Sequence, residues 1–278
     1  MGLQPSFRDM ASSELVSFLL EATGQNEQDA VNPSPMLDLL GLKHLSLDFV
    51  RDIPEAVTVH GERPRALLSF PERVVATEQA LSDKQARFST FHEIGHYVLP
   101  QHLEAIVLCT ERDLSPHSRT AREQDANAFA AELLFHGHRF LLDANSRPIC
   151  ALTVKDLAIR YQASFEATAR RLVEKNLRPC MLVVFQKVSD DGRIDLRQPV
   201  RWEVKYSAAS RLFALRFFRH LQGSLPSELA TALTARGRDI AATITQVEQI
   251  KTLNDVMLPF VMEYFYNQHD ILCLVQPE

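Results

Sequence analysis

The segment RFSTFHEIGHYVLP, residues 87–100, contains the pattern His-Glu-x-x-His at His92, Glu93 and His96. In a helix, side chains four residues apart lie on one face, so His92 and His96 can bind a single metal ion about 2.0–2.1 Å away. Glu93 lies beside them in the position of a general base, and the pattern is typical of zinc-dependent peptidases. The segment therefore predicts a catalytic metal site that still needs a third protein ligand.

The surrounding residues favour a helix. Ser82 and Gln85 form a capping-box start, and Leu99-Pro100 is a stop signal. Apolar residues recur between them at helical spacing: Phe88, Phe91, Ile94, Gly95 and Val98. The alternative, two solvent-facing histidines on an ordinary amphipathic helix, is therefore disfavoured.

A second helix is predicted from near Ser118 or Thr120 to about Phe135, after an irregular stretch that ends at Pro116. Its expected buried stripe consists of Ala126, Phe129, Ala130, Leu133 and Leu134. The many alanines would let this helix pack closely on the first.

Glu123 on this second helix can then reach the metal and complete a His2Glu ligand set, which leaves a fourth position for water or substrate. Asn127, four residues later, can hydrogen-bond a ligand imidazole and fix its orientation. An exposed Glu123 is the competing interpretation, with Asp125 and Glu132 as alternative carboxylates.

Two segments, RFSTFHEIGHYVL from Arg87 and EQDANAFAAELL from Glu123, together resemble the ImmA/IrrE family of metallopeptidases. The resemblance covers roughly residues 10–180 and favours Glu123 as the third ligand. One departure is the absence of the proline that usually follows the second helix; residues 135–138 take its place.

This resemblance implies a zinc-dependent endopeptidase that selectively cleaves a transcriptional repressor of the helix-turn-helix type and so derepresses stress-response or mobile-element genes. Zinc is the expected cofactor, with manganese as an alternative. The implied fold is α+β, with a zincin-like domain built from a small sheet and the His-Glu-x-x-His helix. A different class remains open: a DNA-binding or ligand-sensing regulator with a structural or vestigial metal site.

Upstream of the motif, the pattern predicts two helices followed by three short strands. The helices are 7–23 and Met36–Gly41, and the strands are Leu45–Phe49, Arg65–Phe70 and Arg73–Thr77.

Downstream, Leu152–Leu172 reads as helix, turn, helix, with Thr153 and Ser164 as N-caps. Six Lys/Arg against three Asp/Glu between Lys155 and Arg178 permit DNA contact, although packing is the expected role.

The last part of the chain is predicted to form a C-terminal α/β domain that resembles the sensor-like region of longer family members. Its expected elements are a strand at Met181–Val188, a turn at 190–192, a strand at Val200–Tyr206, helices at 208–221 and 226–236, and a hairpin from Leu258 to Val275. The expected domains are residues 1–147, 148–178 and 179–278.

Composition excludes several classes. A net charge of -5 gives no global reason to expect nucleic-acid binding. The four cysteines are scattered, as expected for reduced, mostly buried thiols. Without a signal peptide or an apolar span, a soluble, cytoplasmic protein with no membrane partner is expected. His136 and His138 are interpreted as helix-end residues and His102 as a surface residue rather than as ligands.

Overall fold

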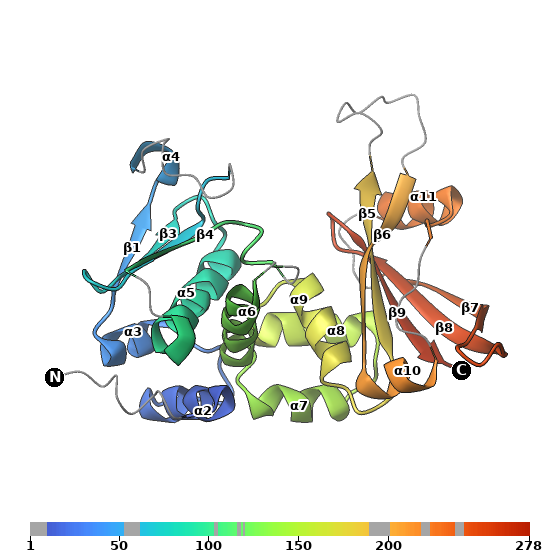
Figure 1. The fold of residues 1–278 in the computed structure, drawn as a ribbon. Helices are drawn as coiled ribbons and strands as arrows, with labels where there is room; N and C mark the ends of the chain where they lie inside the picture. The colour runs from blue at the N-terminus through green and yellow to red at the C-terminus, as the bar shows by residue number, and fades with distance from the viewer. Residues whose placement is uncertain are drawn as a thin grey trace. The chain divides into compact units, whose positions relative to one another are not determined.

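The computed structural model describes residues 10–52, 62–102, 105–115, 118, 120–188, 201–217, 223–236 and 242–278. The chain divides into two units, Met1–Arg139 and Phe140–Glu278. Each unit has its own β-sheet and its own helices (Figure 1). The chain is therefore a mixed α+β protein, whereas the predicted division at residues 147 and 178 stays a prediction.

The first unit is built on a four-stranded sheet of order β1-β3-β2-β4. β1 runs parallel to β3, and the β3–β2 and β2–β4 pairs are antiparallel. The strands are β1 (Lys43–Leu47), β2 (Ala66–Ser69), β3 (Val74–Glu78) and β4 (Ile106–Cys109).

All three predicted strands of this unit exist, but β1 is shifted by two residues, because Phe49 begins the short helix α4 (Phe49–Asp52). The prediction of irregular chain up to Pro116 is wrong for β4, whose register pairs Ala66 with Cys109. Pairing with β2 stabilises this short strand, and a stretch of four residues carries too little pattern to reveal it alone.

The helix that carries His-Glu-x-x-His is α5 (Asp83–Val98). Its predicted start is confirmed, because the backbone N–H of Ser82 donates to Gln85 Oε1 at 3.1 Å. Every residue from Ser89 to Val98 is buried, and the helix packs against β2 and β3 (Figure 1). The metal-binding pattern therefore lies inside the core.

The second predicted helix is α6 (Ala121–Leu134), and the predicted buried stripe is confirmed in full. The Thr120 side chain caps its start by accepting a hydrogen bond from the backbone N–H of Glu123. The remaining elements of this unit include α2 (Ser12–Ala22), which packs on α6, α3 (Ser34–Leu40) and the 3-10 helix η1 (Pro100–His102). The predicted start of the first helix at residue 7 lies outside the described residues.

Gly95 lets α5 and α6 approach closely. A Cβ at this position would lie 3.2 Å from Phe129 Cδ1 and 3.4 Å from the Ala126 backbone. The small residues at this crossing thus bring the two halves of the predicted site together.

The second unit contains a five-stranded antiparallel sheet of order β6-β5-β9-β8-β7. The strands are β5 (Met181–Val188), β6 (Arg201–Ala209), β7 (Ile244–Lys251), β8 (Met257–Tyr266) and β9 (Ile271–Pro277). The helices are α7 (His138–Asn145), which begins before the unit boundary, α8 (Ala151–Arg160), α9 (Phe165–Glu174), α10 (Arg211–Arg216) and α11 (Ser227–Ala235).

The predicted β5–β6 pairing and the closing β8–β9 hairpin are confirmed, and β7 was missed. The helix predicted at 208–221 is described only as α10, and the predicted turn at 190–192 lies outside the described residues. Within the described helices, no segment is long and apolar enough to cross a membrane.

Ser164 caps α9 as predicted, but the prediction for Thr153 is wrong: α8 begins at Ala151 and buries Thr153. Glu263 Oε2 accepts from the Ala151 N–H at 3.0 Å, so a carboxylate from β8 replaces the local cap.

The close helix crossing gives a stability test. Gly95→Val should destabilise the protein by about 1–3 kcal/mol, because the added side chain must push Phe129 and α6 away. The matched control is Ala128→Val on the exposed face of α6, which should cost less than about 0.7 kcal/mol. Urea denaturation followed by circular dichroism measures both; equal losses would mean that the crossing is not tightly packed.

Candidate metal centre

Three predicted ligands converge between α5 and α6. His92 Nε2 lies 3.0 Å from His96 Nε2, and Glu123 Oε2 lies 3.1 Å from each of these nitrogens. Both histidines are fully buried and Glu123 nearly so. The i, i+4 spacing on α5 and the first turn of α6 thus place three donor atoms around one point.

A fourth donor comes from β4. Cys109 Sγ lies 3.4 Å from His92 Nε2, 3.7 Å from His96 Nε2 and 3.8 Å from Glu123 Oε2. Cys109 is fully buried, and all four donor atoms lie within 4.8 Å of one another. Sequence reasoning missed this residue, because a lone cysteine in a strand that was itself missed carries no spacing signal.

Asn127 holds His92, as the spacing predicted. Its Nδ2 donates to the carbonyls of Asp113 (2.7 Å) and Ser115 (3.0 Å) and lies 3.3 Å from Ser118 Oγ. Because the amide nitrogen is engaged by these acceptors, Oδ1 faces His92 Nδ1 at 3.0 Å and accepts its proton. This leaves the Nε2 lone pair of His92 directed at the centre.

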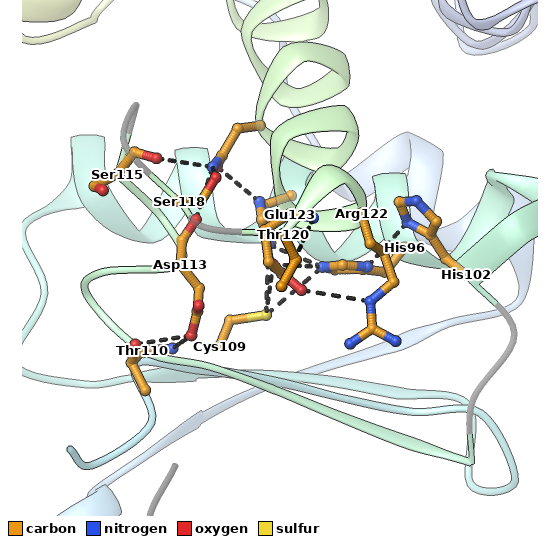
Figure 2. Close-up of polar contacts among 12 residues, drawn as sticks. His96, His102, Cys109, Thr110, Asp113, Ser115, Ser118, Thr120, Arg122 and Glu123 are labelled. Carbon is orange, nitrogen blue, oxygen red and sulfur yellow. Dashed lines mark hydrogen bonds and ion pairs between the residues drawn. The ribbon is translucent and has the colours of Figure 1, made fainter. Parts of the chain in front are cut away.

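His102 plays the corresponding part for His96, and its predicted surface position is wrong. The turn of η1 after Pro100 folds the chain back, so His102 is fully buried, with Nδ1 3.0 Å from His96 Nδ1 (Figure 2). A His96 that keeps Nε2 free for a metal must donate its Nδ1–H to His102. Burial, together with the neighbouring His96, lowers the pKa of His102 to about 4, so its neutral ring can accept.

Glu93 is also fully buried, and among the described residues neither carboxylate oxygen has an N–H or O–H donor. Burial raises its pKa well above the usual value, and contact with the Cys109 thiol offsets this only in part. A buried carboxylate with a raised pKa beside a potential metal site is poised to exchange a proton rather than to support the fold.

The negative charge of Glu123 and the lone pairs of the two histidines favour a bound cation at the centre. Burial alone would raise the pKa of Glu123, but its contacts with the His92 and His96 rings outweigh burial and hold this pKa well below its usual value. Burial lowers the pKa of His92, which favours the neutral ring. An anionic oxygen and two imidazole lone pairs about 3 Å apart repel one another unless a positive ion lies between them.

The donor set fits a divalent metal ion. Tetrahedral zinc with bonds of about 2.05 Å to nitrogen and oxygen separates such donors by about 3.3 Å. The three separations of 3.0 and 3.1 Å come close to this spacing. The residues present are therefore able to hold zinc without rearrangement of the helices.

The other candidate residues lie elsewhere. Asp125 is exposed and accepts from Gln101, and the donor group does not include Asp125 or Glu132. His136 has a left-handed φ of 57° directly after α6, and within the described residues it joins no group of three or more metal-binding side chains.

Comparison with known proteins agrees with this centre. Residues 54–173 match the family model of the IrrE N-terminal-like domain (Peptidase_M78), a span that contains all of the residues described above. The chain thus carries an IrrE N-terminal-like domain, and the resemblance stated from its two helices is confirmed.

A solved structure shares the fold over most of the chain. It is a Mycobacterium tuberculosis transcriptional regulator, with a TM-score of 0.53 and 12% sequence identity over 95% of this chain and 86% of that one. At this identity the likeness concerns the fold alone. No curated protein gives a significant match.

Elemental analysis can identify the third ligand. Purified wild-type protein should contain one equivalent of metal, and Glu123→Ala should lose most of it, because the variant lacks the anionic carboxylate of the donor group. Asp125→Ala, on the exposed face of the same helix, is the matched control and should retain its metal. Metal retained in Glu123→Ala would exclude this carboxylate as a ligand.

Replacing Asn127 or His102, which orient the ligand histidines, should weaken zinc binding without abolishing it. Asn127→Ala and His102→Ala should each weaken zinc binding by about 10–100-fold, because each frees the ring of one ligand histidine. Competition with a chromophoric chelator measures the affinity, again with Asp125→Ala as control. If both variants bound zinc with wild-type affinity, Asn127 and His102 would not be orienting the ligand histidines.

Proposed function

We propose that the chain is a zinc-dependent endopeptidase with a zincin-like centre. The observation that carries this proposal is the buried His92, His96 and Glu123 group with the fully buried carboxylate of Glu93 beside it, inside an IrrE N-terminal-like domain. Two helices supply three ligands and a base, which is the minimum that metal-assisted peptide hydrolysis requires.

In the proposed reaction, His92, His96 and Glu123 hold zinc, which when bound polarises the scissile carbonyl and lowers the pKa of water. Glu93 takes a proton from the attacking water at its carboxylate and delivers it to the leaving amine. Asn127 and His102 keep the two imidazoles in the tautomer that leaves Nε2 free. The surrounding burial excludes bulk water and strengthens these interactions.

Zinc is proposed over manganese because of the donor types. Two imidazoles, a carboxylate and a nearby thiol suit zinc, whereas manganese prefers oxygen donors.

The proposed substrate is a transcriptional repressor of the helix-turn-helix type, whose cleavage would release stress-response or mobile-element genes. The family resemblance motivates this choice, and the described fold neighbour is titled a transcriptional regulator. The donors of the centre are all buried, which suits a selective peptidase better than a digestive one.

The C-terminal unit is proposed to receive a signal or to dock the substrate. It has a hollow of about 570 Å³ between β6, α11 and the β8–β9 turn, where Trp202 and Tyr266 meet edge to face at 6.1 Å. A polar-rimmed hollow with aromatic walls is the usual form of a small-molecule site.

The second candidate function is that of a regulator whose metal site is structural. The four buried donors favour it, because closed four-ligand sites are typical of structural zinc. DNA binding through α9 is less well supported, since Arg170 pairs with Glu174 at 2.6 Å and lies over the Tyr206 ring, and Arg171 is buried. These basic side chains are used within the unit.

The variant Glu93→Gln tests the proposed peptidase activity and the role of Glu93 as its base. This variant should keep its metal and lose cleavage of a candidate helix-turn-helix repressor, because the amide cannot accept the proton. Glu132→Gln, outside the donor group on α6, is the control and should cleave like wild type. Cleavage that persists in Glu93→Gln would remove Glu93 as the base.

The same assay separates the competing functions. Casein in place of the repressor should remain intact, and broad casein digestion would contradict selectivity. Salt-dependent DNA binding by metal-free His92→Ala, with no cleavage either by wild type or by Cys109→Ala, which lacks the fourth donor of the centre, would support the regulator instead.

A further inference from the structure

Cys109 Sγ lies beside the three predicted metal ligands, although a His2Glu site does not require a cysteine. Zinc bound to sulfur at about 2.3 Å and to nitrogen or oxygen at about 2.05 Å separates sulfur from each other donor by about 3.5 Å in a tetrahedron. Cys109 Sγ lies 3.4, 3.7 and 3.8 Å from the three other donor atoms. The sulfur is therefore at the fourth corner of the tetrahedron that His92, His96 and Glu123 begin.

The backbone fixes the cysteine in this place. Cys109 ends β4, is paired with Ala66 across the sheet and accepts a hydrogen bond from the Arg65 N–H at 2.7 Å. The next residue, Thr110, binds Asp113 through both its N–H and its hydroxyl (Figure 2). The Asp113 carbonyl in turn accepts from Asn127. The strand that presents the thiol and the side chain that orients His92 thus belong to one network.

The thiol also has a chemical consequence. A catalytic zinc site keeps one position open for water, whereas a fourth protein ligand closes it. Glu93 is buried next to this thiol, and among the described residues its oxygens have no N–H or O–H donor. While sulfur holds the fourth position, the metal has no water there for Glu93 to deprotonate.

We propose that Cys109 is the fourth ligand of the metal centre and that its thiolate holds the enzyme in a latent form. On metal binding the Sγ–H bond breaks, sulfur bonds to the metal, and the proton passes through Glu93 to solvent. Activation reverses this step: the metal–sulfur bond breaks, sulfur regains a proton, and water takes the fourth position. The latency rests on the proposed peptidase function, whereas the ligand assignment does not.

Cobalt substitution tests the ligand directly. The full chain loaded with one equivalent of Co²⁺ should show a near-ultraviolet thiolate-to-cobalt charge-transfer band, and Cys109→Ala should lose it. Cys273→Ala, which removes a buried thiol on β9, is the matched control and should keep the band. A wild-type protein that binds cobalt without this band, or a Cys109→Ala variant that retains it, would overturn the assignment.

Acetohydroxamate, a small chelating ligand, tests the closed position without any peptide substrate. It should shift the visible cobalt spectrum of Cys109→Ala, and of Cys109→Ser should the alanine variant fail to fold, at concentrations that leave wild type unchanged. An equal shift in wild type would contradict latency. Glu93→Gln should keep the charge-transfer band, so a catalytically dead protein can still support the ligand assignment.

Discussion

One oxygen atom between two imidazoles organises the N-terminal unit. Glu123 Oε2 can lie 3.1 Å from both His92 Nε2 and His96 Nε2 only if α5 and α6 cross closely, and Gly95 against Ala126 permits that crossing. The lone pairs and the negative charge gathered there are costly in a buried site. They become favourable around a cation, so the packing of the two helices and the affinity for metal are two aspects of one constraint.

The ligands are held by contacts that reach outward. His92 is hydrogen-bonded to Asn127, whose amide nitrogen in turn binds Asp113 and Ser115. His96 contacts His102 in the turn after α5. Cys109 adds a β-strand to the same centre. With donors from two helices and a strand, a metal ion would crosslink the sheet to the helices, and displacement of the strand's sulfur would open the site without loss of the other three ligands.

Local patterns predicted the parts of the site that lie on helices. The i, i+4 spacing of His92 and His96, and of Glu123 and Asn127, fixes a face whatever the rest of the chain does. The carboxylate could not be chosen from spacing alone, because Asp125 and Glu132 share the helix; the resemblance favoured Glu123. The positions of His102 and Cys109 depend on a turn and on a strand pairing, which local patterns do not reveal. The cap of α8 likewise comes from Glu263, more than a hundred residues away in the sequence. β7 was missed because its residues are mostly exposed, so its sequence lacks the alternation of apolar and polar residues that predicts a strand.

X-ray absorption at the zinc edge of the full chain tests the central claim most directly. A centre made by His92, His96, Glu123 and Cys109 predicts two imidazole nitrogens, one oxygen and one sulfur around the metal. A first shell without imidazole scattering would contradict the metal centre itself, whatever peptide the protein cleaves.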